Sequence, residues 1–302
     1  MQNRQASTDV EWTILKLLKW ATSFFTSHDI EKPRAEAEIL LSHALKLQRI
    51  DLYLKYDQPL YNDDLKRFKA LIKRRINREP VAYIVGTKEF WSMEFEVTRD
   101  VLIPRPETEF LVETALGLLP KASSSDSIMR PKRILELGTG SGAVILALAS
   151  MRPGHKFFAT DRIWAAIRLA MKNAVRHGLE SVVEWICADW FDPFRPEQCK
   201  FDMIISNPPY VPSRLIGSLQ PEISKYEPIS ALDGGDDGLL CLKHIICHAH
   251  LYLREQGSLL LEMGYDQRSN VEKIVRQCSG YELPVWTKDY SGYDRVIQMR
   301  KK

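Results

Sequence analysis

Apolar positions along the first 80 residues recur at the spacing of amphipathic helices. In the first segment the repeating residues are Trp12, Leu15, Leu18, Trp20 and Phe24. The second segment opens near Pro33 and the third near Asn62 or Asp63, residue types that favour a helix start or cap. The pattern therefore predicts a small helical bundle over residues 1–80.

The period changes after this bundle. Residues 81–105 are rich in β-forming side chains that alternate in places, so we expect a β-hairpin linker there. From Pro131 onward, strand-like runs such as RILEL and FDMIIS alternate with helical segments. That alternation implies βαβ units and a mostly parallel sheet with helices on both faces. We therefore expect a Rossmann-like α/β domain over residues 106–302, with a polar loop at residues 121–131.

Composition and charge limit the function classes. Of the 302 residues, 45% are hydrophobic and 27% charged, and the net charge of +3 argues against a strongly basic nucleic-acid binder. The five cysteines show no disulfide-like regularity and no C-x-x-C pair, so we expect free thiols in a reducing, cytoplasmic setting. We expect neither a secretory signal segment nor a membrane span, because no apolar run is long enough.

A glycine-rich turn follows the first strand of the α/β domain, in the sequence ELGTGSG. Glycines allow a tight turn and a close approach of the backbone to a ligand, and ligands of open α/β sheets bind at the carboxyl ends of the strands. Glycine turns can also occur for packing alone, so the surrounding residues must show whether this turn binds a ligand. The candidate ligand-binding residues in this turn are Gly138, Thr139, Gly140, Ser141 and Gly142.

Acids at the ends of the next two strands support a nucleoside site. Asp161 ends the strand KFFAT, where a carboxylate can accept hydrogen bonds from ribose hydroxyls. After the third strand, Asp189 can take the adenine edge and Trp190 can cover the adenine face. The spacing G-x-G-x-G differs from the dinucleotide fingerprint, and there is no G-K-[ST] phosphate loop. The turn instead resembles motif I of the S-adenosylmethionine-dependent methyltransferases.

The fourth strand ends on Asn207-Pro208-Pro209-Tyr210, beside the expected methyl donor. Proline fixes φ, lacks an N–H and extends the preceding residue, so the two prolines make a stiff segment that presents carbonyl acceptors. The Asn207 side-chain oxygen and the Pro208 carbonyl can accept both N–H bonds of a planar amino group, and Tyr210 adds an aromatic wall. We predict that Asn207, Pro208 and Tyr210 are catalytic and that Pro209 joins them in substrate binding.

The proposed grip suits a nitrogen that is conjugated to a π-system and is therefore a poor nucleophile. Fixed acceptors aim it at the sulfonium methyl and raise its electron density. No strong general base is required, because the N-methylated cation gives its proton readily to water or a carbonyl. Adenine, cytosine and guanine carry such a group, as do glutamine and asparagine side chains. The spacing alone does not decide among them.

Eight segments resemble the protein-(glutamine-N5) methyltransferases, in particular those that act on peptide-chain release factors. They are INREPVAYIVGTKEF, VLIPRPETE, LELGTGSGAVILALA, DWF, DMIISNPPYV, YEPISALDGGDDGL, LLEMGYDQ and KDYSGYDRVI. The resemblance covers roughly residues 10–300. PRPETE is the most discriminating stretch, because the sister family that methylates a ribosomal-protein glutamine differs there and DNA adenine methyltransferases generally lack it.

The resemblance implies a class I methyltransferase fold with seven strands, S-adenosylmethionine as donor, S-adenosylhomocysteine as product, and no metal. It implies a cytoplasmic enzyme whose substrate is the glutamine of the GGQ motif in class 1 release factors, with the helical domain recognising that substrate. It implies neither a membrane nor a sequence-specific nucleic acid as partner. Carried onto this chain, the donor site is Gly138 to Gly142, Asp161, Trp190 and Asn207, and the glutamine site is Asn207, Pro208, Pro209 and Tyr210.

Alternatives stay open at this point. The chain could methylate a glutamine of a ribosomal protein or an amino group of adenine or guanine, or it could be a donor-binding assembly factor without activity. The basic run Lys66–Arg78 could contact ribosomal RNA or an acidic partner, although a solvated helix face is the favoured interpretation. Five cysteine and histidine residues near the C-terminal part of the chain look like metal ligands, but they lie in an apolar helical pattern that favours helix packing. They are Cys241, His244, Cys247, His248 and His250.

Overall fold

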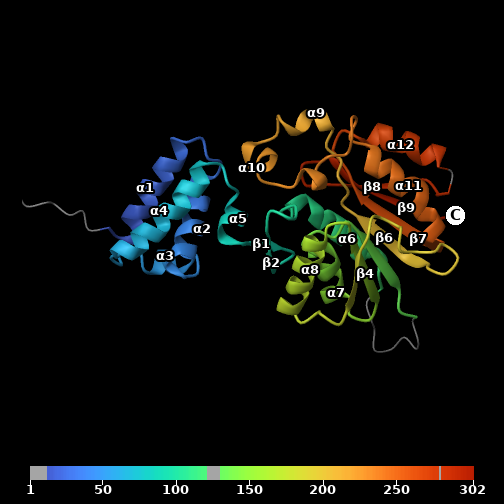
Figure 1. Cartoon of the computed structure of the whole chain (residues 1–302), viewed down its shortest axis with the longest axis horizontal. Coiled ribbons are helices and arrows are strands. Elements are labelled where there is room, and N and C mark those ends of the chain that lie inside the picture. The colour runs from blue at the N-terminus through green and yellow to red at the C-terminus, as the bar shows by residue number, and fades with distance from the viewer. Residues whose placement is uncertain (1–11, 121–129, 279) are drawn as a thin grey trace, which may run out of the picture. The chain divides into compact units, whose positions relative to one another are not determined.

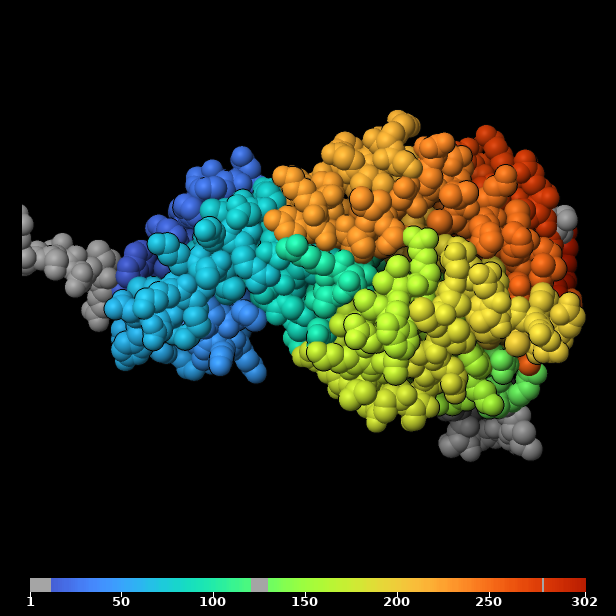
Figure 2. Space-filling view, in the orientation of Figure 1, coloured from blue at the N-terminus to red at the C-terminus, as the bar shows by residue number. Residues whose placement is uncertain are grey.

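The structure is a computed structural model that describes residues 12–120, 130–278 and 280–302. The predicted loop at residues 121–131 lies almost entirely outside the described residues. The chain divides into two compact units, Met1–Gly86 and Thr87–Lys302. Figure 1 labels their helices and strands, and Figure 2 shows the surface of the chain in the same orientation. The hairpin that we expected as a linker is therefore part of the second unit.

The first unit is a helical bundle, as predicted. Its core contains the fully buried side chains of Phe25, Leu40 and Phe68. Tyr61 rather than Asn62 or Asp63 caps the fourth helix, and the Tyr61 backbone N–H donates to the Asp64 carboxylate at 3.1 Å. The helices are α1 (Ile14–Thr26), α2 (Pro33–Leu45), α3 (Asp51–Leu54), α4 (Asn62–Ile76) and α5 (Val81–Val85).

The buried face of α1 differs from the predicted one. Of the five apolar residues that we placed on one face, only Leu18 is buried. Trp20 is 43% exposed and stacks on Phe24 with 5.1 Å between ring centroids. The prediction gave weight to large aromatic side chains that lie on the exposed side of the helix. The residues that are buried also recur at helical spacing, but most of them are smaller. That stripe consists of Ile14, Leu17, Leu18, Ala21 and Phe25.

The basic run on α4 is largely paired within the first unit. Four of its side chains form ion pairs with carboxylates: Lys66, Arg67, Arg74 and Arg75. The solvated-face interpretation is wrong for Arg75, whose side chain is only 3% exposed and pairs with Glu36 at 2.5 Å. A buried guanidinium needs such a partner, because an unpaired buried charge is strongly unfavourable.

The second unit begins with the predicted hairpin, β1 (Thr87–Phe90) and β2 (Met93–Glu96), in an antiparallel register. Trp91 and Ser92 form its two-residue turn and have φ values of 52° and 58°. Two left-handed residues match the twist of a tight hairpin. The backbone N–H of Trp91 donates to Glu109 Oε1 at 2.9 Å, which ties the turn to the PRPETE segment.

A seven-stranded sheet forms the centre of the second unit, in the order β5-β4-β3-β6-β7-β9-β8. The first five strands of that order are parallel, whereas β9 runs antiparallel to β7 and to β8. This confirms the predicted Rossmann-like α/β fold with a seven-stranded, mostly parallel sheet. The strands are β3 (Arg133–Leu137), β4 (Lys156–Asp161), β5 (Val183–Cys187), β6 (Phe201–Ser206), β7 (Leu253–Glu262), β8 (Val285–Lys288) and β9 (Asp294–Arg300).

Helices cover both faces of this sheet. Alternate strand residues face opposite layers, so Ile134 joins one core and Leu135 the other. The first core includes α6 (Glu109–Leu118), α7 (Ala143–Met151) and α8 (Trp164–Arg176). The second includes α11 (Leu240–Tyr252) and α12 (Arg268–Gln277). The connection between β6 and α11 carries three short helices in its described residues: α9 (Ser213–Ile216), α10 (Pro221–Ser224) and η2 (Ile229–Ala231). A further short helix, η1 (Pro106–Thr108), precedes α6.

The chain order reverses at β3. From β3 it proceeds to β4 and β5 on one side, and then crosses back to β6 on the other side. Crevices at such a switch point, outside the carboxyl ends of the strands, are where open α/β sheets bind ligands. The ends of β3, β4 and β6 are therefore the places to look for a site.

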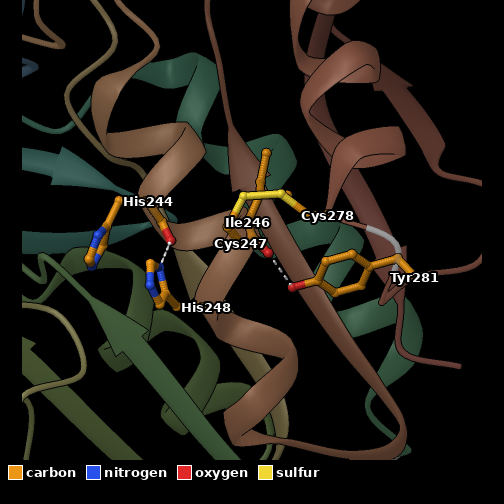
Figure 3. Close-up of a disulfide and its surroundings, with 6 residues drawn as sticks. All are labelled: His244, Ile246, Cys247, His248, Cys278 and Tyr281. Carbon is orange, nitrogen blue, oxygen red and sulfur yellow. Dashed lines mark hydrogen bonds between the residues drawn. A yellow bond between two sulfur atoms is a disulfide. The ribbon is translucent and has the colours of Figure 1, made fainter.

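One pair of cysteines departs from the prediction of free thiols. Cys247 on α11 and Cys278 at the end of α12 form a disulfide with 5.2 Å between their Cα atoms (Figure 3). Their separation of 31 residues gave no signal in the sequence, because only the packing of α11 beside α12 brings them together. Cys187, Cys199 and Cys241 are free. Over the described residues, no helix is long and apolar enough to cross a membrane.

Candidate active site

A cavity of about 440 Å³ opens in the second unit at the carboxyl ends of the strands. Predicted donor residues and predicted acceptor residues line the same cavity. From the donor set these are Gly138, Thr139, Gly140, Ser141, Asp161, Asp189 and Trp190. From the acceptor set they are Asn207 and Pro209. Residues from widely separated segments therefore meet around one volume that can hold a nucleoside-sized ligand.

The glycine turn needs its glycines for two different reasons. Gly138, Gly140 and Gly142 have φ values of 70°, 56° and 80°, a region that other residues rarely adopt. Gly138 and Gly140 border the cavity. A Cβ on Gly142 would lie 3.1 Å from the Cβ of Ala170 on α8, so this glycine permits close helix packing. Gly142 therefore contributes to the packing of the turn against α8 and does not line the cavity.

Two carboxyl groups hold the turn in place. The backbone N–H groups of Gly140 and Ile163 donate to the two oxygens of Asp161, each at 2.9 Å. The Thr139 hydroxyl donates to Glu136 Oε2 at 2.5 Å. Burial raises the pKa of Glu136 to about 8 and also raises the pKa of Asp161. Asp161 lines the cavity at the position where a ribose hydroxyl would find an acceptor.

The end of the cavity beside Gly138 is aromatic. Trp190, with a φ of 38°, follows Asp189 and places its indole 4.0 Å from the position that a Cβ on Gly138 would take. From α11, Cys241 and His244 line the same end, and the rings of His244 and Trp190 lie 6.2 Å apart. This flat, partly polar pocket suits a purine. Sequence reasoning missed Cys241 and His244 as lining residues, because it treated them only as possible metal ligands.

The Asn-Pro-Pro-Tyr segment leaves β6 at the edge of the cavity. The Ser206 hydroxyl donates to the Leu137 carbonyl at 2.7 Å, which fixes the end of β6 against β3. Asn207 is half-buried, and its Nδ2 donates to the Thr108 hydroxyl at 3.1 Å. Because the nitrogen is engaged there, the side-chain oxygen Oδ1 is turned the other way. Pro208 is buried, whereas Pro209 is half-buried and lines the cavity.

Tyr210 is anchored at both ends. Its hydroxyl donates to Glu262 Oε1 at the end of β7 at 3.1 Å, and its backbone carbonyl accepts from Gln267 Nε2 at 3.0 Å. Burial raises the pKa of Tyr210 above its usual range, so the phenol stays protonated. The ring is therefore a fixed neutral wall with its polar tip directed into the protein.

The PRPETE segment supplies another wall of the cavity. Pro104, Arg105 and Thr108 line it. Arg105 forms an ion pair with the buried carboxylate of Glu227, which also accepts from the Ile103 backbone N–H at 3.4 Å. Glu227 belongs to the YEPISA segment, so two of the recognised motifs lock together beside the Asn-Pro-Pro-Tyr segment. Sequence reasoning did not anticipate these contacts, because they join positions more than 100 residues apart.

The arrangement fits an S-adenosylmethionine-like ligand. Gly138 and Gly140 border the cavity in left-handed conformations, a carboxyl stands at the end of β4, and the indole of Trp190 lies beside the turn. Asn207 and Pro209 line the same volume, whereas Pro208 and Tyr210 stand behind them and do not line it. Within the described residues, no three or more His, Cys, Asp or Glu side chains gather in a way that could hold a metal ion. His244, Cys247 and His248 lie along α11, as Figure 3 shows.

Family models match both units. One described as "PrmC N-terminal domain" matches residues 16–86, and one described as "Methyltransferase small domain" matches residues 114–216. Together they span the helical bundle and the part of the second unit that carries the glycine turn and the Asn-Pro-Pro-Tyr segment.

Curated relatives match nearly the whole chain. A release factor glutamine methyltransferase of Geobacter sulfurreducens is 39% identical over 95% of this chain and 96% of its own length. One of Coxiella burnetii is 40% identical over 89% of this chain and 92% of its own length. A bifunctional methyltransferase of Rickettsia prowazekii is 34% identical over 96% of this chain but only 58% of its own length.

Solved structures resemble the fold. The catalytic domain of hMettl16 in complex with the MAT2A 3'UTR hairpin 1 is similar with a TM-score of 0.53 and 15% identity. The likeness covers 78% of this chain and 79% of that chain. At this identity the likeness establishes the methyltransferase fold.

Proposed function

Because this chain belongs to the release factor glutamine methyltransferase family and is a methyltransferase enzyme, we propose its substrate and site residues. It transfers a methyl group from S-adenosylmethionine to the side-chain amide nitrogen of the glutamine in the GGQ motif of class 1 release factors. The product is S-adenosylhomocysteine, and the enzyme works in the cytoplasm, where its substrate takes part in translation termination. The observation that carries the proposal is the placement of Asn207 and Pro209 in the same cavity as the glycine turn.

The donor half of the cavity holds and orients the methyl donor. Gly138 offers its backbone N–H group to the amino-acid end of the donor, and Gly140, whose N–H donates to Asp161, lets the backbone approach the donor closely. Asp161 accepts from the ribose, and Asp189 and Trp190 bind the adenine. When bound, the donor supplies an electrophilic sulfonium methyl group. The wall formed by Trp190 and His244 keeps water from the adenine face and fixes the direction in which that methyl points.

The acceptor half grips the amide. Asn207 Oδ1, turned away from Thr108, accepts one N–H of the glutamine, and the Pro208 carbonyl accepts the other. Both acceptors are rigid, because Asn207 is held by Thr108 and Pro208 has a fixed φ. Two accepted N–H bonds raise the electron density on the nitrogen as the C–N bond forms. The nitrogen then loses one proton to water or a carbonyl, since an N-alkylated amide cation is very acidic.

The test is transfer of radiolabelled methyl from S-adenosylmethionine to purified class 1 release factor. Parallel reactions contain a GGQ→GGA release factor, bulk RNA and ribosomal proteins. We expect label on the wild-type factor and none on the variant. Label on a ribosomal protein or on RNA instead would leave the amide-grip mechanism in place but contradict the proposed substrate.

A further inference from the structure

A buried carboxylate stands behind the acceptor segment without a complete set of partners. Glu262, the last residue of β7, is 1% exposed. Its Oε1 accepts from the Tyr210 hydroxyl at 3.1 Å, while Oε2 has no well-formed hydrogen bond within the described residues. Buried carboxylates are normally paired, because their desolvation is unfavourable. The exception calls for a functional explanation.

Thr108 connects this carboxylate to Asn207. The Thr108 hydroxyl accepts from Asn207 Nδ2 at 3.1 Å, so its own hydrogen is free to point elsewhere. The same hydroxyl lies near the Glu262 carboxyl and lowers its pKa. The geometry falls short of a full hydrogen bond to Oε2, so we count this contact as electrostatic. Glu262 is thus the common neighbour of the hydroxyls of Thr108 and Tyr210.

We propose that Glu262 is a positioning residue for methyl transfer, which orients Asn207 through Thr108 and the aromatic wall through Tyr210. The proposal rests on the proposed function, because it concerns the acceptor half of that site. As a carboxylate, Glu262 attracts the hydroxyl hydrogens of both neighbours. Thr108 then presents a lone pair to Asn207 Nδ2, and Asn207 Oδ1 faces the glutamine amide. The field of the carboxylate also polarises the Asn207 amide through Thr108 and so strengthens Oδ1 as an acceptor.

Protonation of Glu262 reverses this polarity. A carboxylic acid donates a hydrogen bond to Thr108, whose hydroxyl then becomes a poorer acceptor for Asn207. Burial, helped by the nearby Glu107, raises the pKa of Glu262 to about 7, although contacts with Thr108, Tyr210 and the Arg295 guanidinium lower it. The active carboxylate form is therefore lost as the pH falls through about 7.

The experiment compares pH profiles of kcat for the full-length enzyme with release factor and S-adenosylmethionine. We expect the wild type to lose activity on the acidic side of an apparent pKa near 7. Glu262→Gln removes the acidic fall in the pH profile of kcat. It also lowers kcat on the order of 100-fold, because the acceptor atoms for the glutamine amide are no longer aligned. The KM for S-adenosylmethionine stays within about twofold, because Glu262 touches only the acceptor half.

Two further variants separate positioning from a merely structural role. Tyr210→Phe removes a contact that lowers the pKa of Glu262, so the acidic limb moves to higher pH. Thr108→Ser keeps the hydroxyl and stays active, whereas Thr108→Val loses it and behaves like Glu262→Gln. This pair keeps the test decisive if Glu262→Gln fails to fold, because both Thr108 variants retain the small volume of the site.

The outcomes divide cleanly. If the wild type is active, either of two results overturns the positioning role alone. In the first, Glu262→Gln keeps the kcat and the acidic limb of the wild type. In the second, Thr108→Val is as active as Thr108→Ser. A wild-type enzyme that labels no release factor defeats the proposed function and, with it, the role of Glu262.

Discussion

At the scale of single residues, the proposed mechanism depends most directly on Asn207. We expect Asn207→Ala to lower methyl transfer on the order of 100- to 1,000-fold, because one of two fixed acceptors for the glutamine amide is lost. Donor affinity should change only a few-fold, since the glycine turn, Asp161 and Trp190 stay in place. Label transfer and calorimetric titration with S-adenosylmethionine measure the two effects. Full activity in this variant would contradict the role of Asn207.

Gly238 packs closely against the backbone of Tyr210 in the acceptor segment. It has a φ of 76°, and a Cβ there would lie 2.4 Å from the Tyr210 carbonyl oxygen and 2.9 Å from Gln267 Nε2. Gly238→Ala should therefore push Tyr210 out of place, lower stability by about 1–3 kcal/mol and abolish most activity. Thermal unfolding and label transfer are the measurements.

Gly217→Ala is the matched control for this change. Gly217 lies in the same connection between β6 and α11, but nothing stands within 4 Å of an added Cβ and its φ is −66°. We expect its activity and melting temperature to stay near those of the wild type. Equal losses in both glycine variants would show that the Tyr210 contact is not the cause.

The sequence points to candidate site residues whose chemistry a local motif suggests, and it gives no role to residues that act through tertiary contact. The glycine turn, Asp161 and Asn207 belong to the first kind. Thr108 and Glu262 stand in the recognised segments VLIPRPETE and LLEMGYDQ, but their proposed roles arise from hydrogen bonds to Asn207 and Tyr210 across 99 and 52 positions. Nothing in a single sequence specifies which threonine meets which asparagine.

At the scale of elements, periodicity predicted the βαβ core well. Alternating strands such as β3 and the helices between them are long and regular, so their types follow from pattern alone. The face of α1 was wrong, because bulky aromatic residues on its exposed side outweighed the smaller residues of the true stripe. The connection between β6 and α11 gave no signal, since helices of three or four residues carry no usable period.

The disulfide between α11 and α12 gives an element-scale prediction. It closes a separation of 31 residues, and in the chain-entropy account reduction should lower the free energy of unfolding by about 3–4 kcal/mol. Urea unfolding with and without reductant measures this change. Cys247→Ser should be insensitive to reductant, whereas the free-thiol variant Cys199→Ser should respond as the wild type does. Alkylation of all five thiols without prior reduction would contradict the bond.

At the scale of the whole molecule, the donor site belongs to one unit. The cavity is lined entirely by residues between Asp100 and His244, and both cores of the sheet lie within Thr87–Lys302. The first unit has a hydrophobic core of its own. Each unit therefore has a core of its own, and we expect donor binding without the helical bundle.

The bundle instead offers exposed aromatic side chains of the kind that anchor protein partners. Trp20 is 43%, Tyr53 51% and Tyr61 73% exposed. We propose that the bundle forms part of the release-factor contact. Residues 87–302 alone should then bind S-adenosylmethionine with an affinity within a few-fold of the full chain, and kcat/KM for release factor should fall at least about tenfold, equivalent to about 1.4 kcal/mol. Calorimetry and initial-rate labelling separate the two. Unchanged protein methylation after the deletion would place recognition entirely in the second unit, and an equal loss of donor affinity would mean that the truncated chain no longer holds its site.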